Sequence, residues 1–457
     1  MWYVSPPDSK EAPVSSLRRS GMLGFSVVWF GQMVSVLGSG MTQFALTIWA
    51  WQVTGQATVL ALVVFFGYFP RIVMTPIAGA LVDRWNRKLV MMLSDLAAGL
   101  TTIAIFMLFK TGHLEIWHLY AAAAFSGVFG SFQIPAYSAS ITLMVPKEHY
   151  TRADAMLGLV ESASSIFSPI AAGALLAFAG IGTILMIDMA SFVFAIAVLL
   201  FVQVPQPVRV SSEEPKKRGL WADTVLGFRY IFAHRSLRGL LALLLVVNIT
   251  ASVWFALLSP LILARSGGSE LSLATVRMIL GIGGVVGGIV VGIWGGPKTH
   301  RMQWILLAVG ASSLVGTVVV GVGRGLFLWT AGAFLAEALM PVALGANQAI
   351  WQMKTPAHLQ GRIFAARIVV TQLGATLAMI LGGILADRVF EPFMSGSSAL
   401  ARVLQPLVGG GPGAGIGLMF VLAGLVGVAA AVAGYLYRPV RDIETLLPDA
   451  ERVTPNT

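Results

Sequence analysis

The chain has 457 residues, of which 57% are hydrophobic and only 11% are charged, and its mean hydropathy is +0.82. Soluble domains carry about 25% charged residues, so this composition excludes an ordinary soluble enzyme, a nucleic-acid-binding domain and a disordered scaffold. The chain contains no cysteine, and its six histidines lack metal-binding spacing. We therefore expect lipid to surround most of the chain, and we expect no metal site.

Apolar runs long enough to cross a bilayer recur twelve times along the chain. A spanning helix needs about 20 largely apolar residues, and its backbone amides must be paired within the segment. The first six runs are 21–50, 57–82, 88–109, 116–141, 153–178 and 180–204. After a polar gap, the second six are 237–264, 271–297, 302–322, 325–352, 363–386 and 414–437. We predict an all-α polytopic membrane protein with 12 transmembrane helices.

The two sets of helices resemble each other in sequence. A shift of 210 residues places Pro146 and Arg152 over Pro356 and Arg362. Parallel six-helix repeats of this kind occur in one large class of transporters, so we predict two pseudo-symmetric six-helix halves. The predicted organisation is an N-terminal tail (1–20), an N-terminal half (21–204), a linker (205–236), a C-terminal half (237–437) and a C-terminal tail (438–457).

The linker contains an amphipathic segment after its charged run. Its apolar residues fall at helical spacing, and charged residues lie on the other faces. The apolar set is Leu220, Trp221, Val225, Phe228 and Phe232. We predict a helix that lies at the cytoplasmic membrane interface, with a soluble linker helix as the alternative.

Basic residues are divided unequally between the two sets of loops. With the N-terminus inside, the inner segments hold 23 Lys and Arg residues and the outer segments hold six. Arg367 is counted with the inner set and Arg277 with the outer set. Because Lys and Arg concentrate in short cytoplasmic loops, we predict that both termini are cytoplasmic. This distribution explains the net charge of +10 without a nucleic-acid partner.

The loop after the second helix reads Gly79-Ala-Leu-Val-Asp83-Arg84-Trp-Asn86-Arg87-Lys88. It resembles the signature loop of the major facilitator superfamily, Gly-x3-Asp-Arg-x-Gly-Arg-Arg/Lys, with Asn86 in place of the second glycine. Gly79 permits close helix approach, and Asp83 ends the helix where it can accept hydrogen bonds. We expect Asn86 to adopt a left-handed turn. We expect the three basic residues to hold this gating loop at the cytoplasmic face.

The resemblance implies the major facilitator fold, with two halves that rock around a central site. The fifth helix is similar to the antiporter pattern of this superfamily at Ser168, Pro169 and Gly173. Later segments, such as Ala386-Asp-Arg-Val-Phe-Glu-Pro392, resemble the bacterial branch of macrolide-efflux and siderophore-export carriers. The resemblance implies a monomeric, multi-pass protein of the bacterial inner membrane. No ATP-binding loop is present, so we expect no cofactor and a proton gradient as the energy source.

Ionisable residues within apolar runs are functional candidates. Glu161, Glu337 and Arg71 are expected near the membrane midplane, with one glutamate coupling transport to protons and Arg71 as its counter-charge. Glu161 is favoured because it adjoins the small residues of the fifth helix. Asp95 and Asp188 are expected to fix helix packing through polar partners instead.

The substrate cavity is expected among polar residues of the apolar runs. Gln32, Gln43, Gln133 and Gln348 are the candidate lining residues. Nearby aromatic and methionine residues suit an amphiphilic ligand, and the excess of buried acids favours a cationic or neutral one. The sequence therefore predicts a secondary active exporter of a hydrophobic or amphipathic small molecule, such as a drug, macrolide or siderophore, by proton antiport.

Two other classes of function remain as alternatives. A lipid or lysolipid transporter, or an importer, would share the same architecture. A polytopic membrane enzyme or a non-transporting sensor is more remote, because His and Asp do not cluster at one membrane face.

The glycines of the eighth helix have one further interpretation. Gly281 and Gly283 could belong to a dinucleotide-binding loop, but no strand precedes them. We interpret Gly284, Gly288 and Gly292, which recur every four residues, as a smooth ridge for helix contact.

Overall fold

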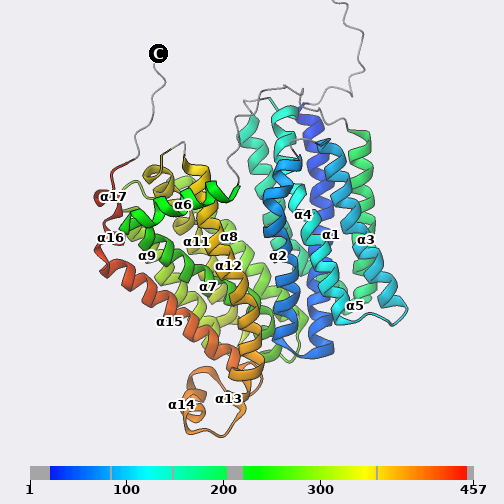
Figure 1. The fold of residues 1–457 in the computed structure, drawn as a ribbon. Coiled ribbons are helices and arrows are strands. Elements are labelled where there is room, and N and C mark those ends of the chain that lie inside the picture. Colours follow the sequence, from blue (N-terminus) through cyan, green and yellow to red (C-terminus); the bar gives the residue numbers. More distant parts are fainter. Residues whose placement is uncertain (1–20, 83–84, 147–148, 203–219, 357–358, 450–457) are drawn as a thin grey trace, which may run out of the picture.

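The computed structural model describes residues 21–82, 85–146, 149–202, 220–356 and 359–449. Within these ranges most residues are helical and no strand occurs. Figure 1 shows two helical bundles side by side, one built from the N-terminal half and one from the C-terminal half. The predicted all-α architecture is confirmed.

The N-terminal bundle has five helical segments. They are α1 (Met22–Thr54), α2 (Ala57–Val82), α3 (Arg87–Lys110), α4 (Ile116–Met144) and α5 (Tyr150–Phe201). α5 breaks at Gly180, whose φ of 71° and ψ of 173° favour glycine. In the first arm of α5, Ser168 Oγ donates to the Leu37 carbonyl of α1 at 3.0 Å, and in the second arm Asp188 accepts from Ser39 at 3.1 Å. Both arms therefore run along α1, and the predicted boundary between the fifth and sixth spans coincides with the break.

The C-terminal bundle begins with α7 (Arg235–Arg265) and α8 (Glu270–Trp294). The third crossing is α9 (Arg301–Ala311), which continues through a π-helical segment to α10 (Val319–Val322). The remaining segments are α11 (Leu326–Lys354), α12 (Gln360–Leu385), η4 (Ala386–Phe390), α13 (Glu391–Ser395), α14 (Ala399–Val408) and α15 (Ala414–Leu436). The short α13 and α14 form an extension between the predicted spans 363–386 and 414–437 (Figure 1).

The number of membrane-crossing helices agrees with the prediction. In the described part of the chain, ten helices are long and apolar enough to cross a membrane. The stretch Met156–Phe201 counts once among them but contains both arms of α5. With the two arms of α5 counted separately and with α4, a helix of 29 residues, helices occupy all twelve predicted positions.

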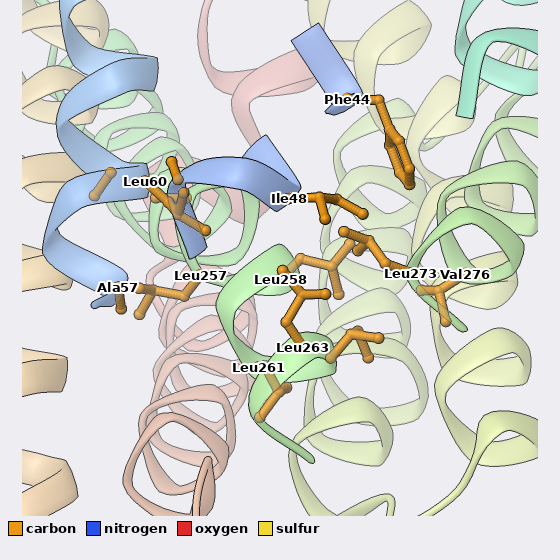
Figure 2. Close-up of a cluster of buried hydrophobic side chains, with 14 of the residues drawn as sticks. Phe44, Ile48, Ala57, Leu60, Leu257, Leu258, Leu261, Leu263, Leu273 and Val276 are labelled. Atoms are coloured by element: carbon orange, nitrogen blue, oxygen red, sulfur yellow. The ribbon is translucent and has the colours of Figure 1, made fainter. Parts of the chain in front are cut away.

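The two ends of the molecule differ in how the bundles meet. We call the end that carries residues 85–87, 145–146 and 354–356 the linker end, and the opposite end the far end. At the far end one apolar core joins both bundles, with Ile48 and Leu60 from one side and Leu257 and Leu273 from the other (Figure 2). At the linker end each bundle has a core of its own. The molecule is therefore closed at the far end.

The linker helix predicted from sequence is present as α6 (Leu220–Ala233). Gly227 lies against the backbone of α12 at Arg362, where a side chain would not fit, and Ile231 is fully buried. Tyr230 donates to the carbonyl of Lys354 at 3.2 Å. Residues 203–219 lie outside the described ranges, and Arg235 already belongs to α7.

The first part of the predicted C-terminal tail packs on the C-terminal bundle. It forms α16 (Arg438–Arg441) and α17 (Ile443–Leu446). The buried Lys354 ammonium donates to the Glu444 carbonyl at 2.7 Å and to Asp449 Oδ1 at 2.8 Å. Val440 and Ile443 are buried in the core of the linker end. The bundle thus extends beyond the predicted boundary at 437, because buried apolar residues and a lysine anchor continue past it.

The glycine ridge predicted on α8 is wrong. Nothing lies close to the positions that a side chain would occupy at Gly284, Gly288 or Gly292. Gly283 and Gly287 instead face the backbone of α11 at Phe334 and Ala338. These two glycines share a different side of the helix, so the close approach occurs there.

Candidate functional site

A cavity of about 210 Å³, partly open to solvent, lies between the two bundles. α2 contributes Tyr68 and Ile72, and α7, α11 and α12 contribute the rest of the lining. The C-terminal lining residues are Asn248, Ala251, Ser252, Trp254, Phe255, Glu337, Gln372, Ala375, Thr376 and Met379. The lining therefore combines aromatic rings, amides and hydroxyls with a single carboxylate.

Glu337 places this carboxylate deep within the bundle. It lies eleven residues after the start of α11, about 17 Å along the helix axis. Arg277 lies seven residues into α8 and acts electrostatically on Glu337. The Arg277 guanidinium donates to Ser259 Oγ at 2.8 Å and sits 5.5 Å from the centroid of the Phe255 ring. The site thus holds an acid and a base that come from different helices.

Arg277, rather than Arg71, is the base whose charge acts on Glu337. Arg71 is partly buried on α2, where its carbonyl accepts from Thr75 at 2.7 Å. Arg277 was counted as an outer loop residue, although the predicted span 271–297 already contained it. The depth of Arg277 in the membrane could therefore be predicted from the sequence. Its partner could not, because it depends on the rotation of α8 and α11 about their axes.

An aromatic contact closes one wall of the cavity and joins the two bundles. Tyr68 of α2 meets Phe255 of α7 edge to face, with ring centroids 6.1 Å apart. Phe255 also contacts Arg277, so this base lies next to the contact between the bundles.

Asp95 forms a separate polar cluster inside the N-terminal bundle. It is 3% exposed, and it accepts from Gln32 Nε2 at 2.7 Å and from Gln133 Nε2 at 2.8 Å. Gln133 also donates to Gln32 Oε1 at 2.8 Å. The expectation that Asp95 pairs with polar groups agrees with this geometry. Gln32 and Gln133, which were expected to line the substrate cavity, are not among the lining residues of the cavity described above, and their amides bind Asp95.

Asp188 is surrounded by hydroxyl groups. Ser39 donates to Oδ1 at 3.1 Å, and Thr102 donates to Oδ2 at 2.8 Å. Ser191 lies at the limit of hydrogen-bond distance, 3.5 Å. The carboxylate joins α1, α3 and the second arm of α5, which agrees with the predicted packing role.

The remaining polar candidates lie in three different environments. Glu161 is exposed on the first arm of α5 and is not among the lining residues of the cavity. Gln43 is exposed on α1. Gln348 accepts from Arg367 at 3.1 Å, and the Arg367 guanidinium also lies 5.4 Å from the Trp351 ring centroid. Arg367 belongs to the helix interior rather than to the inner loop in which it was counted.

The small residues of the fifth helix allow close helix contacts. Ser168 is buried and faces Gly40 of α1, where any side chain would collide with it. Gly173 faces Ala274 of α8, across the boundary between the bundles. Pro169 is buried between these two contacts. The three residues thus bring α1, α5 and α8 together.

Part of the signature loop can be described. Asp83 and Arg84 lie outside the described ranges, as does the environment of Gly79. Asn86 has a φ of −67°, so the expected left-handed turn is wrong; its side chain instead caps α3 by accepting from Leu89 N at 3.1 Å. Lys88 donates to the carbonyls of Leu200 and Val202 at 3.1 and 2.9 Å.

The basic residues of the loop are used within the bundle. Arg87 is 9% exposed. Lys88 satisfies the last carbonyl groups of α5, where a helix end lacks partners. Both residues thus also contact the bundle, and the expectation that they hold the loop at the cytoplasmic face stays a prediction.

The architecture and cavity can be compared with known proteins. A family model described as Major Facilitator Superfamily matches residues 28–379. Macrolide efflux protein A of Streptococcus pyogenes is 28% identical over 380 residues, which cover 80% of this chain and 90% of that protein. Enterobactin exporter EntS of Shigella flexneri is 23% identical over 390 residues, which cover 82% of this chain and 88% of that protein.

Solved structures show the same fold. A bacterial homolog of the human lysosomal transporter Spinster, in an inward-facing and unoccupied conformation, superposes with a TM-score of 0.66 at 13% identity. The match covers 92% of this chain and 98% of that chain. A bacterial homologue of the iron transporter ferroportin, in an inward-facing state, gives a TM-score of 0.59 at 16% identity over 90% of this chain and 99% of that chain.

Two six-helix bundles around a cavity define a helical membrane transporter. The chain belongs to the major facilitator superfamily, and its relatives identify it as a transporter of the efflux branch. The family and these relatives are transporters and not enzymes, which removes the membrane-enzyme alternative.

Proposed function

We propose that this transporter exports a hydrophobic or amphipathic small molecule in exchange for protons, by alternating access. The observation that supports this proposal best is the cavity between the bundles, where aromatic and amide side chains line the wall together with Glu337. Apolar walls with few polar groups suit an amphiphilic ligand. Two relatives named as a macrolide efflux protein and an enterobactin exporter support the outward direction.

Glu337 is the proton-coupling group of this proposal. It combines three properties: it lines the cavity, it lies within the membrane, and it is opposed by Arg277. A carboxylate opposed by a base on a neighbouring helix exchanges a proton as its access to water changes. Glu161 is a weaker candidate than the sequence indicated, because it does not line this cavity.

The linker end is the cytoplasmic end in this proposal, and both termini are cytoplasmic. Arg277 and Arg367 belong to helix interiors and are therefore removed from the loop counts. The inner loops then hold 22 basic residues and the outer loops hold five. The inner excess is unchanged by this correction. With this orientation the molecule is closed toward the outside, and the membrane is the inner membrane of a bacterium.

The proposal is tested with purified protein in proteoliposomes under an imposed pH gradient. The substrates are lipophilic dyes, macrolides and catecholate siderophores, with a lysolipid as a separate arm. We expect Glu337→Gln to abolish uphill export while downhill exchange persists, because glutamine preserves shape and hydrogen bonding but cannot titrate. Glu161→Gln is the matched comparison, and we expect it to retain uphill export.

Each outcome decides between named alternatives. Full uphill export by Glu337→Gln would remove the coupling assignment. Gradient-driven movement of the lysolipid alone would favour a lipid transporter, and accumulation in the opposite direction would favour an importer.

A further inference from the structure

The far end of α12 makes a polar contact with the other bundle. Beyond α12 the chain continues through η4, where Asp387 Oδ1 accepts from the backbone N–H of Ala57 at 3.0 Å. Its second oxygen, Oδ2, accepts from the N–H of Thr58 at 2.7 Å. Both donors belong to the first turn of α2, so a carboxylate of the C-terminal bundle caps a helix of the N-terminal bundle.

α2 needs this cap from outside its own segment. The first N–H groups of a helix have no partner within the helix. Ser, Thr, Asp and Asn are the favoured capping residues, whereas Gln56 precedes α2. A carboxylate at this position also interacts favourably with the helix dipole. Asp387 thus caps α2 from the other bundle, whereas α8 is capped by Ser269, the residue directly before it in the chain.

The cap lies within the apolar core that closes the far end. Ala57, Ala61 and Ala386 are fully buried. Gly383, one turn before Asp387, lies so close to Thr58 and Ala61 that a side chain would collide with them. Movement of the bundles apart at this end therefore requires that the cap break.

A second carboxylate in the same segment serves as an internal comparison. Glu391 accepts from the N–H groups of Gly413 at 3.3 Å and Ile416 at 2.9 Å. These donors start α15, which belongs to the same bundle as Glu391. Two carboxylates four residues apart thus each cap a helix. Of the two, Asp387 caps a helix of the other bundle, and Glu391 caps a helix of its own bundle.

We propose that Asp387 is a gate residue of the far end, whose cap on α2 forms when this end closes and breaks when it opens. This inference rests on the alternating access proposed above. In the open form water reaches the freed N–H groups of α2. In the closed form, removal of the carboxylate leaves them buried without a partner. Loss of Asp387 therefore disfavours the closed form selectively.

The test uses the absence of cysteine from the chain. A single Leu257→Cys reporter, at a fully buried position of the far-end core (Figure 2), is placed in each variant. Its reaction rate with a hydrophilic maleimide is measured in lipid nanodiscs without substrate. We expect Asp387→Ala to raise the rate about tenfold, the size of a helix-cap effect. Asp387→Asn, which keeps one acceptor oxygen, should give a smaller increase.

A change on the donor side provides a second, independent variant. Thr58→Pro removes one of the two N–H groups, and proline is tolerated in the first turn of a helix. We expect it to raise the reporter rate as well, and we expect a smaller additional effect when it is combined with Asp387→Ala. Independent, fully additive effects would contradict a direct contact in the working protein.

Glu391→Ala is the matched control. We expect it to lower the melting temperature without raising the rate at Leu257→Cys. A second reporter, Leu237→Cys in the linker-end core, detects general unfolding and should remain slow in every variant. A wild-type rate in folded Asp387→Ala, or an equal rise in Glu391→Ala, would overturn the gate assignment. The labelling assay uses neither substrate nor a gradient. Its result therefore does not depend on whether the proposed substrate or proton coupling is correct.

Discussion

Glu337 and Arg277 form the acid–base pair of the central cavity. A charge within a membrane is costly, and partners or water-filled cavities reduce that cost. Here the guanidinium has the Ser259 hydroxyl and the face of Phe255, and the carboxylate lines the cavity. The carboxylate is thus open to the cavity, while the base is held by partners of its own.

Substitution of Arg277 and of Arg71 should show which arginine acts as the counter-charge of Glu337. Arg277→Gln removes the counter-charge, so we expect uphill export to fall about tenfold, within the range of coupling between sites. Arg277→Lys keeps the charge but loses the planar contact with Phe255, and we expect an intermediate rate. Initial export rates in proteoliposomes measure both. A large loss in Arg71→Gln combined with normal export in Arg277→Gln would restore the assignment drawn from sequence.

Asp95 and Asp188 show a different use of buried carboxylates. Neutral amides and hydroxyls surround them, and each joins three helical segments of the N-terminal bundle. Buried polar groups must be hydrogen-bonded, and fully satisfied clusters hold helices in one arrangement. Neither acid lines the cavity, so both are assigned to the framework around the site.

At the scale of elements, contacts between helices depend on which face carries the glycines. Gly283 and Gly287 bring α8 onto the backbone of α11, whereas Gly284 and Gly288 face open space. Small residues at such interfaces allow backbones to approach closely. The position of Glu337 on α11 relative to Arg277 on α8 depends on this approach.

Paired glycine substitutions test this packing. We expect Gly287→Val to destabilise the protein by about 3 kcal/mol or to prevent folding, because its side chain meets the Ala338 backbone. Gly288→Val carries the same loss of helix flexibility but meets nothing, so its stability should be close to that of the wild type. Fluorescence-detected size exclusion after heating measures the difference. Equal destabilisation of the two variants would argue against the described rotation of α8.

For the whole molecule, the two bundles share a core at the far end and have separate cores at the linker end. α2 packs against α12, and α5 packs against α8, and these two helix pairs make the most extensive contacts between the bundles. Such an arrangement lets the bundles rotate about these pairs while each remains intact. The apolar core at the far end then stabilises the form that is closed at this end relative to the form that is open there.

Orientation in the membrane can be measured with single cysteines in the cysteine-free chain. Glu115→Cys and Ser397→Cys lie at exposed far-end positions, and Thr299→Cys and Gln352→Cys lie at exposed linker-end positions. We expect an impermeant maleimide to label the first two in intact spheroplasts and the second two only after permeabilisation. This expectation follows from the 22 inner against five outer basic loop residues. Labelling of the opposite pair would reverse the proposed topology.

The sequence by itself determined the helices, the two halves and the family. Spans depend on local hydrophobicity and length, and Gly180 marks a local break, so both were readable along the chain. The signature loop was equally local, because its residues are consecutive. The tail that packs through Lys354 was missed, since its apolar contacts come from helices far away in sequence.

Only the tertiary structure decided which polar groups meet. Gln32 and Gln133 serve Asp95, Arg277 opposes Glu337, and Asp387 caps α2. In an apolar helix every face is hydrophobic, so the sequence pattern does not fix the rotation of the helix about its axis. That rotation is set by packing between helices, through glycines and small side chains whose neighbours are distant in sequence. The helices were therefore predictable, whereas the partners of their buried charges were decided by how the helices pack.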